Sequence, residues 1–441
     1  MPLQYILTQR IDIDLKRLQR INPLLERFIG EGNQLPGAQT LLWRRGELVD
    51  FQSAGFRDRE NRLPVEEDTI FRIYSMTKPL ISAAMMMLFE EGHFQLFSPV
   101  SEFIPGFRNL QVFQKEDPQT GEWITEKMEH PVTLHELLTH TSGLTYGLQA
   151  AHHPVARRYN EMNLEGDSFS LEQVVDKILE QPLAFQPGSH WHYSASTDVL
   201  ARVVEVISGK SIDAFLRERL FEPLEMKDTG YFLPPEKHDR LSEIYCIANW
   251  FDRGISPEDL EQMWREGAVA QRLVSGETHR CLEPHQAFRG GHGLVSTSKD
   301  YLNFCRMLIQ RGSWEGERLL APKTVELMTM NHVRQEMMPL EIRGYEILGE
   351  GFGLGFGVNL NTAASLNLGS VGTFGWGGLA STGFIIDPLE ELILIQMAQF
   401  IPPPEQLLFK YLRTAVYQSL TNGEIVLFGK QEIRGISQPW R

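Results

Sequence analysis

The stretch Phe71-Arg-Ile-Tyr-Ser75-Met-Thr-Lys78-Pro79 contains the motif that says most about this chain, S-x-x-K. We expect a helix to begin near Ser75, because a proline such as Pro79 is tolerated only within the first turn of a helix. A spacing of three then places Ser75 and Lys78 on one helical face. A serine hydroxyl needs a neighbouring base to become a good nucleophile, and a buried lysine amine can act as that base. On its own the motif also fits an ordinary helix start, so the rest of the sequence has to decide.

The residues after the motif favour a buried site. The run Leu80–Phe89 is almost wholly apolar, which is typical of a helix surrounded by core. It is too short to cross a bilayer. We therefore expect Lys78, at the head of this helix, to be at least partly buried.

Strand patterns lie near both ends of the sequence, and helical patterns lie between them. Residues 37–56 contain two apolar runs around a turn at Arg45-Gly46, and residues 383–397 contain two more around Pro388-Leu-Glu390; both indicate β-hairpins. Residues 351–358 alternate glycine with apolar residues and predict a further strand. Helices are predicted at Leu134–Leu138, Leu171–Leu179, Thr197–Ile207 and about 404–420. This order indicates a sheet domain built from both ends of the chain, with a helical domain inserted.

Bulk composition narrows the range of functions. With 441 residues, the chain is longer than one simple core usually organises. Its formal net charge of −15 disfavours nucleic acid and anionic membranes as partners. Cys246, Cys281 and Cys305 fit neither a metal knuckle nor a redox pair, so we expect buried core residues. The N-terminal residues do not resemble a secretory leader, and we expect a cytoplasmic protein.

Four later segments resemble motifs of one known group of proteins and occur in its order. They read Leu137-Leu-Thr-His-Thr-Ser-Gly-Leu144, Pro187-Gly-Ser-His-Trp-His-Tyr-Ser194, Gly290-Gly-His-Gly-Leu-Val-Ser-Thr297 and Trp376-Gly-Gly378. Together with the S-x-x-K motif, they resemble the serine β-lactamase and penicillin-binding-protein superfamily, and most closely the class C-like family VIII carboxylesterases. The resemblance spans roughly residues 35–400.

The resemblance implies a fold and a division into domains. The expected fold is α/β and β-lactamase-like: an antiparallel sheet flanked by helices, plus an inserted, mostly helical domain. We assign residues 1–105 and 286–441 to the sheet domain. Residues 106–285 are assigned to the helical domain, with a variable insertion at about 233–285 that is polar and rich in proline.

The resemblance also implies roles for particular residues. Ser75 is the expected nucleophile, and Lys78 and Tyr193 are its expected activators, with the choice of base between them left open. The backbone N–H groups of Ser75 and Leu379 are expected to form the oxyanion hole. Residues expected to contact the substrate are Trp376, Gly377, Gly378 and His292, although a purely structural role in its glycine-rich loop is the alternative for His292.

Two departures from the β-lactamase pattern bear on the substrate. The second motif, Y-x-N in β-lactamases, reads Tyr193-Ser-Ala195 and lacks the amide. The third motif begins with Trp376 where β-lactamases have a lysine that attracts the substrate carboxylate. Losing that cation removes a contact worth about 1.5–3 kcal/mol. Both departures favour uncharged esters over β-lactams or peptides.

We therefore expect a serine hydrolase that cleaves carboxylic esters with short to medium acyl chains. An acyltransferase using the same acyl-enzyme is the nearest alternative. A β-lactamase or D-amino-acid peptidase is a further one, and a non-catalytic binding protein is disfavoured by the intact Ser75, Lys78 and Tyr193. We expect a small-molecule ester as the partner, no cofactor and no metal, and the oligomeric state is left open. His135 and His140 resemble a zinc motif, but a spacing of five puts them on different helical faces.

Overall fold

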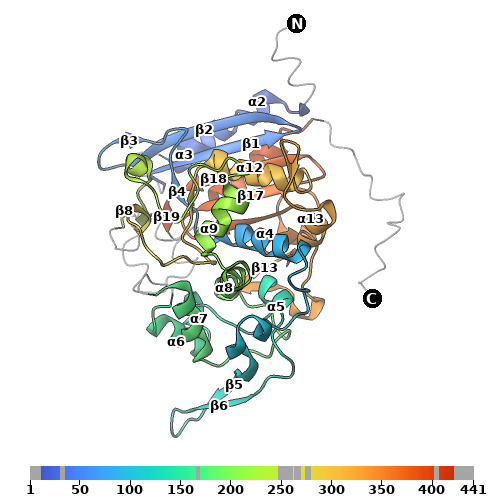
Figure 1. Cartoon of the computed structure of the whole chain (residues 1–441). Helices are drawn as coiled ribbons and strands as arrows, with labels where there is room; N and C mark the ends of the chain where they lie inside the picture. Colours follow the sequence, from blue (N-terminus) through green and yellow to red (C-terminus); the bar gives the residue numbers. More distant parts are fainter. Residues whose placement is uncertain are drawn as a thin grey trace.

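The computed structural model describes residues 11–29, 35–164, 169–246, 262, 270–273, 280–401 and 407–421. Its central element is an eight-stranded sheet in the order β14-β15-β16-β17-β18-β1-β2-β3, and every neighbouring pair is antiparallel (Figure 1). The strands are β1 (Gly37–Arg44), β2 (Glu47–Asp58), β3 (Leu63–Pro64), β14 (Glu350–Phe352), β15 (Gly357–Asn359), β16 (Phe374–Gly378), β17 (Thr382–Asp387) and β18 (Leu392–Ala398). The sheet thus draws strands from both ends of the chain, as the sequence predicts.

Apolar side chains cover both faces of the sheet. Leu41 and Trp43 of β1 belong to one core cluster, whereas Ala38 and Leu42 belong to another, because successive side chains of a strand point to opposite faces. Helices α4 (Thr77–Glu90) and α12 (Ser298–Ile309) contribute to the first cluster, and α3 (Ile21–Phe28) and α15 (Leu407–Tyr417) to the second. Burial on both faces explains why β1 and β18 consist mostly of apolar residues.

The helix that follows the S-x-x-K motif lies deep in the protein. All residues from Thr77 to Leu88 of α4 are buried. Ser75 lies just before the helix, in the single 3₁₀ turn η1 (Tyr74–Met76). Helix α4 packs against α8 (Ser196–Ser208) and α9 (Ile212–Leu216), so the motif lies where the sheet meets the helical part of the chain (Figure 1).

The other α-helices of the described residues are α2 (Leu15–Leu18), α5 (Leu134–Leu138), α6 (Pro154–Glu161), α7 (Leu171–Leu179), α13 (Pro322–Met328) and α14 (Thr362–Ser365). Short strands outside the large sheet pair as β4 (Phe71–Arg72) with β9 (Val295–Ser296), β5 (Gln111–Glu116) with β6 (Trp123–Lys127), β10 (Ser313–Trp314) with β11 (Glu317–Arg318), and β12 (Leu340–Ile342) with β13 (Tyr345–Ile347). In Figure 1 the β5–β6 hairpin projects away from the sheet at the foot of the molecule.

The two hairpins predicted around the first and last long strands are present. Arg45 and Gly46 form the turn between β1 and β2, both with positive φ. The single strand predicted at 351–358 is wrong, because the structure has two short strands there, β14 and β15, paired antiparallel. Gly355 lies in the turn between them, with φ +96°, and a Cβ on it would lie 2.2 Å from Ser82 Oγ of α4. A turn packed tightly against a buried helix has no room for a Cβ, so it needs glycine just as a crowded strand does.

Part of the predicted insertion at 233–285 lies outside the described residues, namely 247–261, 263–269 and 274–279. Its described pieces include β7 (Tyr245–Cys246), which pairs antiparallel with β8 (Gln271–Arg272) and parallel with β19 (Phe400–Ile401), directly after the last long strand. The domain boundaries near 105 and 286 stay predictions.

All three cysteines are free and buried, as predicted. Within the described residues, no helix combines the length and apolar character that crossing a bilayer requires.

Candidate active site

The turn that carries Ser75 is held by its neighbours on both sides. Tyr74, the residue before Ser75, has a φ of +44°, a strained value for a residue with a side chain. The carbonyl of Ile73 accepts a hydrogen bond from Thr382 Oγ1 at 3.3 Å. The N–H of Ile73 donates to the carbonyl of Leu294 at 3.0 Å. These contacts fix the backbone that leads into Ser75.

Lys78 makes direct contact with Ser75. Its side chain is only 2% exposed, and Nζ donates to Ser75 Oγ at 3.2 Å and to the carbonyl of Gly291 at 2.7 Å. The helical spacing of three brings amine and hydroxyl together, as the motif predicts. The carbonyl of Gly291, which lies in the loop before β9, holds the amine in place.

Tyr193 approaches Lys78 with the face of its ring. Lys78 Nζ lies 4.6 Å from the ring centroid, within the range of a cation–π interaction. The side chain is 5% exposed, and its hydroxyl accepts a hydrogen bond from Trp376 Nε1 at 3.4 Å. Thus Lys78 is hydrogen-bonded to Ser75, whereas Tyr193 joins the site through Lys78 and Trp376.

Strand β16 lies alongside the Ser75 turn. A Cβ on Gly378 would lie 2.4 Å from the carbonyl oxygen of Ile73, so only glycine permits this approach. Gly377 pairs with Gly383 in the sheet, and Leu379 begins the turn after β16 and packs against the same apolar cluster as Tyr74. Trp376 and Gly377 are half-buried, which leaves part of this strand open beside the site.

His292 lies one step further out. Its Nδ1 is 3.2 Å from the hydroxyl of Tyr146, whose ring stacks on Tyr193 with a centroid distance of 6.0 Å and an interplanar angle of 21°. Lys78 Nζ lies 5.2 Å from the Tyr146 ring centroid. His292 therefore contacts the residues that surround Lys78.

Three residues of the site, Tyr146, Asp198 and Gly291, had no role predicted from the sequence, although Gly291 lies within the matching segment Gly290–Thr297. Asp198 Oδ1 accepts the N–H of Gly291 at 3.2 Å, and the carbonyl of Gly291 accepts from Lys78. Burial raises the pKa of Asp198, against the opposing charges of Arg289 and Lys78. An acid in the first turn of the largely apolar helix α8 was the available signal for Asp198, since a buried charge needs partners.

The histidines of the rejected zinc motif bind different partners. His140 Nδ1 accepts the N–H of Ser194 at 3.3 Å, and burial holds its pKa well below the usual value. His135 Nε2 lies 3.1 Å from His332 Nδ1. Among the residues that the structure describes, no three histidine, cysteine or acidic side chains are grouped to hold a metal ion.

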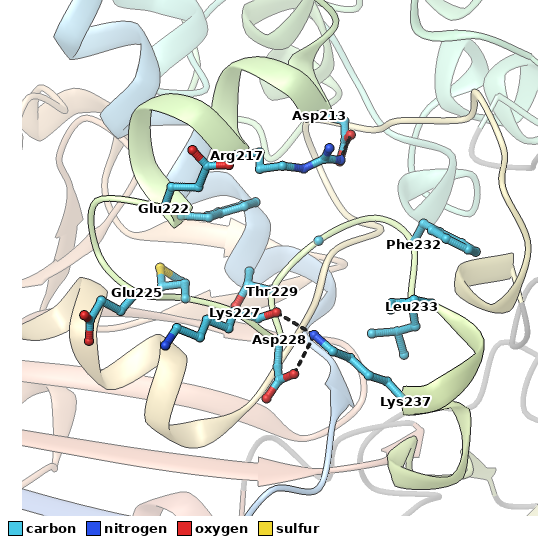
Figure 2. Close-up of a pocket in the computed structure, with 14 residues that line it drawn as sticks. Asp213, Arg217, Glu222, Glu225, Lys227, Asp228, Thr229, Phe232, Leu233 and Lys237 are labelled. Carbon is cyan, nitrogen blue, oxygen red and sulfur yellow. Dashed lines mark hydrogen bonds and ion pairs between the residues drawn. The ribbon is translucent and has the colours of Figure 1, made fainter.

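A separate pocket of about 590 Å³ lies beside α9 and residues 225–237, and it does not include Ser75, Lys78 or Tyr193 in its lining. Figure 2 shows Lys237 directed at Asp228, and Arg217 beside Asp213. Lys237 Nζ lies 2.9 Å from Asp228 Oδ1 and donates to the carbonyl of Lys227, and Arg217 pairs with Asp213. The pocket is therefore no part of the Ser75 site.

Known proteins resemble this chain in sequence and in fold. The model of the Beta-lactamase family matches residues 25–416. Protein Rv1367c of Mycobacterium tuberculosis (strain ATCC 25618 / H37Rv) is 32% identical over 381 residues, covering 85% of this chain and 88% of that protein. Esterase EstB of Burkholderia gladioli is 29% identical over 377 residues, covering 83% and 86% respectively. The solved structure of EstCE1, described as a hydrolase with promiscuous acyltransferase activity, has a TM-score of 0.72 at 24% identity, covering 93% of this chain and 100% of that one.

The fold and the comparisons together define an enzyme of the β-lactamase-like serine hydrolase class. The predicted fold class is confirmed by the family match and by the shared fold of EstCE1. More specifically, the chain belongs to the Beta-lactamase family. The similarity to an esterase agrees with the resemblance to family VIII carboxylesterases.

Proposed function

We propose that this enzyme hydrolyses carboxylic esters of short to medium acyl chain length through an acyl-enzyme on Ser75. The observation that carries the proposal is the 3.2 Å contact between Lys78 Nζ and Ser75 Oγ at the head of a buried helix. An amine at this distance can take the serine proton as the hydroxyl attacks.

The proposed cycle has two halves. Ser75 Oγ bonds to the ester carbonyl carbon while its proton passes to Lys78 or Tyr193. The N–H groups of Ser75 and Leu379 would stabilise the oxyanion, a role supported by the close approach of β16 to the Ser75 turn. The bond to the alcohol oxygen then breaks, and the base returns the proton to the leaving alcohol. Water attacks the acyl-enzyme by the same route and releases the acid.

Uncharged esters fit the site better than β-lactams or peptides. The position of the cationic lysine in β-lactamases is occupied by Trp376, whose half-buried ring offers apolar surface and whose N–H points to Tyr193. Ala195 supplies no side-chain amide for a peptide-like group. The name of the relative from Burkholderia gladioli, Esterase EstB, supports the same substrate class.

Acyl transfer to an alcohol is the second candidate, because it uses the same acyl-enzyme with an alcohol in place of water. The observation that favours it is the apolar surface around Tyr193, described in the next subsection. EstCE1, which shares the fold, is described as having promiscuous acyltransferase activity beside hydrolysis.

The test is hydrolysis of p-nitrophenyl butyrate by Ser75→Ala, with Ser101→Ala as the matched control in the short helix η2 (Val100–Glu102). We expect Ser75→Ala to lose at least about 10³-fold in kcat and the control to keep wild-type activity. A fluorophosphonate should add mass to the peptide that contains Ser75. Wild-type turnover by Ser75→Ala, or labelling at another serine, would refute the assignment.

A further inference from the structure

Tyr193 belongs to a cluster of apolar side chains that we call the Tyr193 cluster. Its buried members are Trp191, Tyr193, Val333, Leu340 and Phe352, and its half-buried members are Met337, Met338, Ile342, Ile347 and Trp376. The half-buried members leave apolar surface in contact with solvent on the same cluster that holds a proposed catalytic residue. Such a surface is costly unless it covers something apolar.

Most of the half-buried members come from the β12–β13 hairpin and the turn before it. This hairpin has one apolar face and one polar face. Leu340 pairs with Ile347, and both pack on the Tyr193 cluster together with Ile342. Glu341 and Glu346, which also face each other across the hairpin, are exposed. An isolated two-stranded hairpin is only marginally stable, so its packing on the Tyr193 cluster fixes its apolar face at the site.

The chemistry of the cycle decides which part of an ester meets this surface. The group that takes the proton from Ser75 must also deliver it to the leaving alcohol oxygen, and therefore must come within hydrogen-bond reach of that oxygen. Lys78 Nζ contacts both Ser75 Oγ and the ring face of Tyr193, so the amine links the hydroxyl to the Tyr193 cluster. Whichever of them acts, the alcohol leaves on the side of the Tyr193 cluster.

We infer that the β12–β13 hairpin, with Met337 and Met338, forms the subsite for the alcohol portion of the ester and selects hydrophobic, uncharged alcohols. This inference rests on the proposed function and names its substrate class. Unbranched, polarisable methionine side chains adapt to groups of different shape, so the subsite accepts a range of apolar alcohols.

The same subsite gives an apolar alcohol an advantage over water as acceptor. The alcohol oxygen bonds to the acyl carbon, the bond between that carbon and Ser75 Oγ breaks, and the alcohol proton passes through the base to Ser75. No further reagent is needed, and the products are a new ester and free enzyme. Acyl transfer and hydrolysis thus compete at one site.

The experiment compares butyrate esters of methanol, butanol and hexanol by pH-stat titration. For the wild type we expect kcat/KM to rise about fourfold for each methylene that the Tyr193 cluster covers. Ile342→Thr keeps the branched shape and should lower the hexyl-to-methyl ratio at least about fivefold, and Met337→Gln gives a second test should the first variant fold poorly. Glu341→Gln, on the exposed face of the same hairpin, should leave the ratio unchanged.

A second series varies the acid and keeps methanol as the alcohol. Its chain-length preference should be the same in Ile342→Thr and the wild type. A flat alcohol series in the wild type, or a change confined to the acyl series in Ile342→Thr, overturns the subsite assignment while Ser75-dependent hydrolysis persists. Failure of the proposed function itself would give a different result, because the Ser75→Ala variant would then hydrolyse every ester as fast as the wild type.

Discussion

Trp376 donates its indole N–H to the hydroxyl of Tyr193, at 3.4 Å. From the sequence, Trp376 is predicted only to line the substrate site. The contact gives the same side chain a second task, because it also holds the phenol oxygen of Tyr193 in place. In place of the cation found at this position in β-lactamases, Tyr193 receives a neutral hydrogen bond.

Replacing Trp376 with phenylalanine separates these two tasks. Trp376→Phe keeps an aromatic wall and removes the donor, and a neutral hydrogen bond contributes about 1 kcal/mol. We expect kcat for p-nitrophenyl butyrate to fall about fivefold with KM nearly unchanged. Trp376→Leu, which also removes the ring, should raise KM as well. A rise in KM without a fall in kcat for Trp376→Phe would show that the N–H does not act through Tyr193.

Gly291 is a position where added volume should disturb the surroundings of Lys78 directly. A Cβ there would lie 2.8 Å from Tyr146 Oη, 3.1 Å from Asp198 Oδ2 and 3.3 Å from Lys78 Nζ. Gly291→Ala should therefore displace the amine from Ser75 and lower kcat at least about tenfold, with a small effect on the melting temperature. Gly230→Ala is the control, since its Cβ would meet only ordinary contacts, the nearest at 3.6 Å. Equal activity in both variants would contradict the crowded geometry around Lys78.

Acid should destabilise the fold through buried histidines. Burial lowers the pKa of His192 to about 4, and burial with the nearby His332 lowers that of His135 to about 4 as well. Between pH 6.5 and about 4 the unfolded chain binds protons that these rings do not, so the free energy of unfolding falls as pH falls. For His192 the loss approaches about 3 kcal/mol.

Asp300 works in the opposite direction over the same range, because burial raises its pKa to about 6 and the folded protein then binds that proton first. His140 shares the lowered pKa of His192, and Asp198 the raised pKa of Asp300, so the test compares a variant with the wild type in urea titrations from pH 6.5 to 4. His192→Gln should reduce the slope of unfolding free energy against pH. An unchanged slope would mean that His192 takes up its proton in the folded state as readily as in the unfolded chain.

The large sheet could be predicted well where its strands are long. β1 and β18 are apolar runs bounded by turn residues, and such runs have few other interpretations. The β14–β15 hairpin could not be predicted, because its turn glycines continue the same alternation as the strands. Position 355 needs glycine because Ser82 of α4 lies so close to it, and no local sequence pattern reveals that neighbour.

The candidate site also has a part that could be predicted from the sequence and a part that could not. Ser75 and Lys78 are joined by helical spacing, so a short motif was enough to predict their contact. Tyr146, Asp198 and Gly291 come together only because the loop after α5, helix α8 and the loop before β9 pack on one another. Distances of this kind depend on tertiary packing, and no spacing along the chain encodes them.

The pairing of β1 with β18 has a consequence for how the enzyme is made. Ala38 pairs with Ala398, so β1 has to wait for a strand that is synthesised much later before the sheet can close. The Ser75 turn rests on β16 and on Thr382 of β17, which the ribosome also makes long after Ser75 itself. A growing chain therefore contains the S-x-x-K motif long before the strands that support it exist, and the proposed active site can assemble only after β17 has been synthesised.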